Sequence, residues 1–198
     1  MRILAIDYRE LAPQRLEVGQ KDKDDWTCIF NGRDLTGWTW DGKGTARTED
    51  GTLVLADHAI VRRAAAANFE LRGEVKLVKG GDAQYCGGFT LRVPNVPSVD
   101  PRISMFADGD VHIYHRGGKS LAQLGSGRIP LQRWHPFLLR AVGPSITFNV
   151  GDKTISAQVE VLEKGDVSLD GRGRIEFKDL WLRELGPDGK LLDAAQKP

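Results

Sequence analysis

Side chains that can transfer protons alternate with apolar residues in three stretches of this sequence. Glu74 lies in the first stretch (69–78), Arg92 in the second (88–93) and His112 in the third (110–116). An arginine beside a carboxylate keeps it ionised, and a positioned carboxylate can act as a general base. An imidazole with a pKa of about 6.5 exchanges protons near neutral pH. Glu74, Arg92 and His112 are therefore the candidate catalytic residues, provided that the fold brings them onto one face.

Aromatic and acidic residues near these stretches are candidates for binding a saccharide. A saccharide needs hydrogen-bonding groups for its hydroxyls and an aromatic surface for its C–H groups. The four residues that offer one or both are Tyr85, Tyr114, Trp40 and Asp170. Tyr114 is expected on the same strand face as His112, because side chains two positions apart share a face.

The candidate residues can also be interpreted as structural, with no role in a site. Glu74 and Arg92 could form a cross-strand ion pair on a solvated sheet face. His112 could simply be exposed, and Asp170 could form a turn with Gly171. The sequence favours neither interpretation decisively at these positions.

Metal and cofactor chemistry find no support in the sequence. His112 and His115 fall on opposite faces of a strand, so they cannot share an ion. The chain has no Gly-x-Ser-x-Gly motif, and the segment 171–173 is too short for a phosphate loop. Cys28 and Cys86 are expected to be buried free thiols. We expect no metal and no cofactor.

The composition excludes several classes of protein. The 28 Lys and Arg residues nearly balance 27 Asp and Glu residues, giving a formal charge of +1, which argues against a general nucleic-acid binder. The longest uncharged stretch, 141–151, is far shorter than the roughly 20 residues of a membrane span. The apolar run near Met1 ends at Asp7, which is too short for an export signal. Two alternatives follow for the compartment: a cytoplasmic protein, or a domain of a longer exported precursor.

Short alternating segments separated by glycine-containing turns predict an all-β protein. The 23 glycines are spread along the chain, and helical patterns are weak. The expected strands are 69–78, 88–93, 110–116, 137–141, 145–150, 153–161 and 174–183. This series predicts a two-sheet antiparallel sandwich or jelly roll. We expect one such domain over 25–186, an N-terminal extension over 1–24 with an added strand at 2–9 and a charged, solvated linker at 21–25, and a frayed tail over 187–198.

Two segments at opposite ends of this predicted domain resemble a known family. The segment 29–38 reads Ile-Phe-Asn-Gly-Arg-Asp-Leu-Thr-Gly-Trp, and 177–185 reads Phe-Lys-Asp-Leu-Trp-Leu-Arg-Glu-Leu. Both resemble motifs of the bacterial 3-keto-disaccharide hydrolase domain family. The resemblance implies a concanavalin A-like jelly roll that binds a saccharide, and for some members hydrolysis of sugars oxidised at the third carbon. It also implies that Glu74 and Arg92 match family positions.

The sequence also departs from the family pattern at several polar positions. Cys86 stands in place of an asparagine-serine step, Ser104 and Phe106 lie where a carboxylate and an amide are usual, and Asp170 falls in a changed segment. The first hypothesis is therefore a hydrolase of 3-keto-glycosides. The alternative is a noncatalytic carbohydrate-binding or protein-interaction module on the same scaffold.

Overall fold

A computed structural model describes residues 16–65, 67–78, 84–93, 101–115, 118–159 and 165–192, and the side chains of Arg92 and Val93 are outside that description. Over these residues every regular element is a β-strand, and the strands form two antiparallel sheets. The predicted all-β sandwich is therefore confirmed. The strand expected at 2–9 lies outside the described residues.

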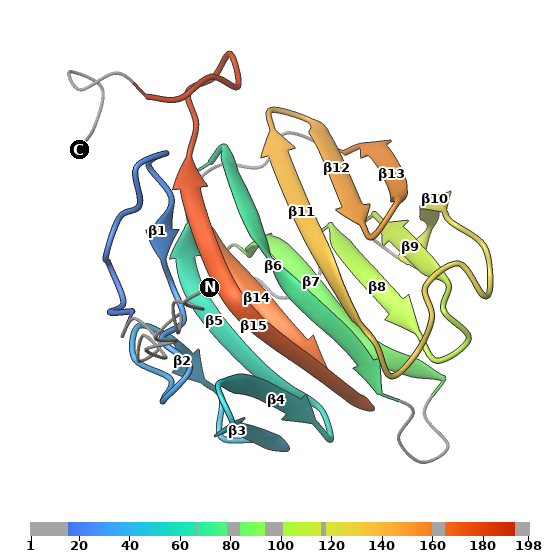
Figure 1. Cartoon of the computed structure of the whole chain (residues 1–198). Helices are drawn as coiled ribbons and strands as arrows, with labels where there is room; N and C mark the ends of the chain where they lie inside the picture. Colours follow the sequence, from blue (N-terminus) through green and yellow to red (C-terminus); the bar gives the residue numbers. More distant parts are fainter. Residues whose placement is uncertain are drawn as a thin grey trace, which may run out of the picture.

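The first sheet, sheet A, is stacked face to face on the second sheet, sheet B (Figure 1). Seven strands of sheet A are, in spatial order, β13 (Lys153–Gln158), β12 (Ser145–Val150), β11 (Trp134–Val142), β6 (Phe69–Val78), β15 (Arg174–Glu184), β4 (Thr52–Ala56) and β3 (Thr45–Glu49). The eighth strand, β1 (Thr27–Cys28), pairs with β15.

The second sheet, sheet B, combines strands from distant parts of the chain. Its strands are, in spatial order, β10 (Ser120–Gln123), β9 (Val111–Tyr114), β8 (Arg102–Phe106), β7 (Tyr85–Val93), β14 (Gly165–Gly171), β5 (Ala59–Ala65) and β2 (Thr39–Trp40). Strand β14 pairs with β5 and β7, so the residues paired with it lie 73 to 112 positions earlier in the chain. These crossovers between two antiparallel sheets are typical of a jelly roll.

The core lies between the sheets and is centred on aromatic side chains. Phe89 of β7 has its ring centroid 5.2 Å from that of Phe137 and 5.5 Å from those of Phe148 and Phe177, which all belong to sheet A. All four rings are buried. Tilted aromatic pairs at these separations stabilise a core beyond their buried area. The inner faces of both sheets are thus occupied by packing, which leaves the outer faces for function.

The predicted strands that lie within the described residues agree with the structure, and the described residues at both ends of the domain form turns. The segment 21–25, predicted to be a solvated linker, is an ordered turn in which Asp22 accepts hydrogen bonds from the backbone N–H groups of Asp24 and Trp26. Asp22 also pairs with Arg72 at 2.8 Å. The start of the predicted tail is a turn that is held by a bridge between Leu185 and Leu191. No helix among the described residues is long and apolar enough to cross a membrane.

Candidate functional site

The outer face of sheet B carries polar side chains from five neighbouring strands, and the strand register aligns them in rows across the sheet. Because side chains alternate along a strand, Phe89 and Leu91 point into the core and Thr90 points outward. One row across the sheet joins His112, Ser104, Gly88 and Asp170. The next row joins Tyr114, Arg102, Thr90, Ser168 and Arg62. We call this surface the sheet B outer face.

A tyrosine–aspartate pair lies at the centre of this face. The hydroxyl of Tyr85 donates a hydrogen bond of 2.7 Å to Oδ1 of Asp170. Asp170 is aligned with Gly88, where a Cβ atom would lie 1.9 Å from the carbonyl oxygen of Ile103. Strand β7 therefore approaches β8 too closely for a side chain at this position.

Burial changes the acid–base behaviour of both members of the pair. Burial raises the pKa of Asp170, and the hydrogen bond from Tyr85 and the charges of Arg172 and Arg102 offset only part of this effect. Burial, with the charge of Asp170, also raises the pKa of Tyr85 well above its usual value. The phenol is thus protonated at neutral pH, and Asp170 is a stronger base than an exposed aspartate.

Tyr85 is also the first of four partly exposed rings that form an aromatic strip. The other three are Phe106, His112 and Tyr114. Successive ring centroids are 5.6, 5.0 and 5.2 Å apart, and the rings of His112 and Tyr114 are stacked with an interplanar angle of 9°. The guanidinium of Arg102 lies 5.2 Å from the ring centroid of Tyr114. Such a strip offers an apolar surface of the kind on which a sugar ring stacks.

A buried aspartate fixes the orientation of His112. Asp110 is 4% exposed, and its Oδ2 lies 3.0 Å from Nε2 of His112 and accepts a 2.6 Å hydrogen bond from Gln123. Burial raises the pKa of Asp110, but hydrogen bonds from Gln123 and from the backbone of Gly125 outweigh it, so the net shift is downward. Nδ1 of His112 lies 3.1 Å from the hydroxyl of Ser120. Both ring nitrogens of His112 are therefore engaged within the protein.

Several polar groups of this face lack an ion-pair or hydrogen-bond partner in the described part of the chain. Arg62, Arg102 and Arg172 form no ion pair with any described carboxylate. Nε of Arg62 and Oγ of Ser168 are buried without a hydrogen-bond partner among the described residues. Buried polar atoms are nearly always hydrogen-bonded, so two such neighbours call for an explanation.

The structure does not bring Glu74 to this face. Glu74 lies on β6 of sheet A, where its carboxylate pairs with Lys178 at 3.4 Å. Arg92 and His112 lie on β7 and β9 of sheet B. The prediction that Glu74 shares a face with them is wrong, because β6 and β7 follow one another along the chain but enter different sheets. The side chain of Arg92 lies outside the described residues.

Trp40 also stands apart from the aromatic strip. It lies on the edge strand β2 and pairs with Val61, whose side chain is buried in the core, so the register places Trp40 on the inner side of sheet B. Its indole N–H donates to the carbonyl of Lys43 at 2.9 Å. The expectation that Trp40 forms a rim for a saccharide on the polar face is therefore not supported by the register, although the side chain is 41% exposed.

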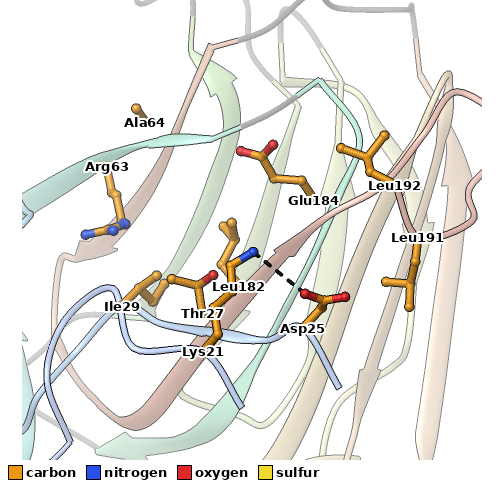
Figure 2. Close-up of a pocket in the computed structure, with 10 residues that line it drawn as sticks. All are labelled: Lys21, Asp25, Thr27, Ile29, Arg63, Ala64, Leu182, Glu184, Leu191 and Leu192. Carbon is orange, nitrogen blue, oxygen red and sulfur yellow. Dashed lines mark ion pairs between the residues drawn. The ribbon is translucent and has the colours of Figure 1, made fainter. Parts of the chain in front are cut away.

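A cavity of about 300 Å³ lies elsewhere, between β1, β5 and β15 (Figure 2). Lys21 and Asp25 at its border pair at 3.7 Å, and Ile29 and Leu182 line its apolar part. This cavity contains none of the candidate residues. Among the described residues, no group of three or more histidine, cysteine, aspartate or glutamate side chains is arranged to hold a metal ion.

Sequence reasoning identified Tyr85, Asp170, His112 and Tyr114, which the structure brings together, but missed their partners. No sequence pattern marks Asp110 as the partner of His112, and the unpartnered atoms of Arg62 and Ser168 gave no signal in the sequence. Phe106 was detectable, because period-two alternation places it on the same face as Arg102 and Ser104.

Solved structures with the same fold include proteins that bind or act on carbohydrates. A candidate glycosyl hydrolase from Parabacteroides distasonis matches with a TM-score of 0.61 and 17% identity, covering 81% of this chain and 94% of that one. The carbohydrate-binding module CBM66 from Bacillus subtilis matches with a TM-score of 0.58 and 16% identity, over 73% of this chain and 93% of that one. The β-glucanase of Bacillus licheniformis has a TM-score of 0.57 and 12% identity, over 78% and 95%.

The fold and these similarities define a carbohydrate-related jelly-roll domain. No curated protein sequence matches the chain. A family profile does match, over residues 25–183, and the chain therefore belongs to the family described as 3-keto-α-glucoside-1,2-lyase-like domains. This confirms the resemblance that the motifs at 29–38 and 177–185 suggested.

Proposed function

We propose that this domain binds a 3-keto-glycoside on the sheet B outer face and cleaves its glycosidic bond. The observation that carries the proposal is the hydrogen-bonded pair of Tyr85 and Asp170 beside the aromatic strip. The pair supplies a carboxylate whose basicity is increased by burial. The strip supplies a surface for the sugar ring. Membership of a lyase-like family supports the same chemistry.

The proposed reaction uses the acidity that the ketone confers on its neighbours. The C2–H bond breaks, and its proton passes to the carboxylate of Asp170. The electron pair forms the C1=C2 double bond, while the C1–O bond breaks and its electrons leave on the departing oxygen, which takes a proton from water. The hydroxide left from that water then adds to C1, and the proton held by Asp170 returns to C2, which gives the net result of hydrolysis and restores the carboxylate. One base and one group that polarises the ketone suffice for this step.

Each group on the face has a distinct role in this scheme. Tyr85 orients the carboxylate of Asp170 through its hydrogen bond, which leaves Oδ2 for the substrate. Arg102, whose charge is close enough to influence the pKa of both groups, is placed to polarise the ketone oxygen. His112 was the other candidate base, but both its nitrogens are occupied, which favours a role in the aromatic strip.

The test is turnover of a panel of 3-keto-disaccharides by the wild-type protein and two variants. Asp170→Asn keeps the shape and an acceptor for Tyr85 but removes the base, so kcat is expected to fall about 10²- to 10⁴-fold. Glu74→Gln on sheet A is the matched control and should leave turnover unchanged. Loss of turnover in Glu74→Gln with full activity in Asp170→Asn would contradict the proposal.

A noncatalytic carbohydrate-binding module is the second candidate function. The occupied nitrogens of His112 and the similar fold of a carbohydrate-binding module favour it. Wild-type protein that binds a disaccharide without cleaving the 3-keto form would establish this function instead.

A further inference from the structure

We infer that Arg62 and Ser168 form a subsite for a second sugar ring, beside the ring that occupies the Tyr85–Asp170 pair. This assignment rests on the proposed function and names two residues that determine affinity for the second ring. It predicts that these two side chains act on a two-ring ligand and not on a single ring.

The first observation is that these two neighbours have unused hydrogen-bonding capacity. Arg62 on β5 and Ser168 on β14 are aligned in the sheet register. Ser168 is only 2% exposed, and neither its Oγ nor Nε of Arg62 has a partner among the described residues. A buried hydroxyl without a partner carries a desolvation cost that a bound ligand can relieve. Arg62 is partly exposed, so its flexible side chain is the part of this region that can move to admit a ligand.

The second observation is the position of this pair relative to the proposed reaction centre. Ser168 precedes Asp170 by two residues on β14, so both point to the same face about 7 Å apart. Strands β9, β8, β7, β14 and β5 are consecutive neighbours, and four strand spacings amount to about 19 Å. The polar row from Tyr114 to Arg62 is therefore longer than one pyranose ring. A ring over the aromatic strip leaves the β14–β5 end of this row for a second ring.

The chemistry of the pair favours a neutral hydroxyl over an anion. A sugar hydroxyl can accept a hydrogen bond from the Nε–H of Arg62 and donate one to Oγ of Ser168. Two carboxylates, Asp166 and Asp170, flank Ser168 at two residues on either side and on the same face. Their negative charges oppose the attraction that the guanidinium of Arg62 exerts on an anion, whereas they do not repel a neutral hydroxyl. The subsite therefore fits a polyhydroxylated ring.

The experiment compares one-ring and two-ring ligands in Ser168→Ala, with Ser156→Ala as the control. Ser156 is an exposed serine on β13 of sheet A, bonded to Thr147. For Ser168→Ala we expect KM for a 3-keto-disaccharide to rise about tenfold and KM for the methyl 3-keto-glucoside to stay constant. Ser156→Ala should change neither. Thermal denaturation of Ser168→Ala should show an unchanged or higher Tm, because the lost hydroxyl had no partner in the free protein.

Binding of trehalose and methyl α-glucoside separates this inference from the proposed function. Neither ligand has the C3 ketone, so neither undergoes the elimination, and calorimetry reports binding alone. Selective weakening of trehalose binding in Ser168→Ala supports the subsite even when wild-type protein cleaves no 3-keto sugar. Equal changes for the one-ring and two-ring ligands, or no change for either, would overturn the subsite while turnover by wild type leaves the proposed function intact. Absence of binding by either sugar, together with absence of turnover of 3-keto sugars by wild type, would overturn both.

Discussion

The outer faces of the two sheets both carry charged side chains, but the two faces differ in how those charges are paired. On sheet A the buried carboxylate of Glu70 pairs with Arg140 and with Arg183, and Glu176 pairs with Lys76 and Arg174. On sheet B, Asp110 contacts His112 and Asp170 accepts a hydrogen bond from Tyr85. The arginines of that face, however, form no ion pair with a described carboxylate, and Ser168 and Arg62 each keep a buried atom without a partner among the described residues.

Aromatic rings lie near cationic groups on both faces, but only on sheet B do they form a strip. On sheet A, Trp134 lies under the ammonium groups of Lys76 and Lys178, and Trp26 lies under the guanidinium of Arg72. On sheet B, Arg102 and Arg172 lie over Tyr114 and Tyr85, and the rings of the aromatic strip also contact one another and keep partly exposed surfaces. Charges that are paired within a face stabilise the fold, whereas unpaired polar groups can contact a ligand. This difference supports the proposal that the ligand binds on sheet B.

The largest expected effect on stability comes from Glu70 on sheet A. Glu70→Gln removes a buried charge that two arginines contact, and we expect the free energy of unfolding to fall by about 2 to 3 kcal/mol. Binding and turnover of saccharides should remain at wild-type values in the folded protein. Urea denaturation with a parallel turnover assay measures both. A Glu70→Gln protein that is fully stable but inactive would contradict this expectation, because it would assign function to the sheet A face.

Asp170 on sheet B should behave in the opposite way. Its pKa is raised in the folded protein, so its ionised form destabilises the fold at neutral pH. Asp170→Asn is therefore expected to raise the free energy of unfolding at pH 7 by about 1 kcal/mol while turnover is lost. The gain should shrink as the pH falls through the raised pKa and vanish below the ordinary aspartate value, because the wild-type carboxyl is then protonated in both states.

Denaturation curves of wild type and Asp170→Asn between pH 3 and pH 7 test this sign directly. A stability difference that grows as the pH falls would show that the folded protein stabilises the charge of Asp170, contrary to our expectation. Asp110, whose pKa is lowered, provides an internal contrast. Its contribution is present above the ordinary aspartate value and is lost as the pH falls through the lowered value.

The smallest effect is expected at Glu74. Its pair with Lys178 is partly exposed, and such pairs contribute from nothing to about 1 kcal/mol. Glu74→Gln should change the free energy of unfolding by less than about 1 kcal/mol, and added salt should weaken the pair in wild type. Chemical denaturation at low and high salt checks this. A larger loss would mean that the ion pairs of sheet A act as one network.

The sequence by itself determined the strands, the sandwich and the family. Strict alternation from Phe69 to Val78 requires one buried and one polar face, whatever the rest of the chain does. The motifs at 29–38 and 177–185 are local, so they could be recognised without a structure. Alternation also placed Phe106, His112 and Tyr114 on polar faces correctly.

Only the tertiary structure decided which of these faces meet. Alternation is a property of one strand, whereas strand order depends on long-range packing between segments as distant as β5 and β14. That order separated Glu74 from His112 and joined Tyr85 to Asp170 across 85 positions. It also decided which charges are neutralised and which remain without a partner, because hydrogen bonds and ion pairs depend on distances of a few ångströms that no periodicity encodes.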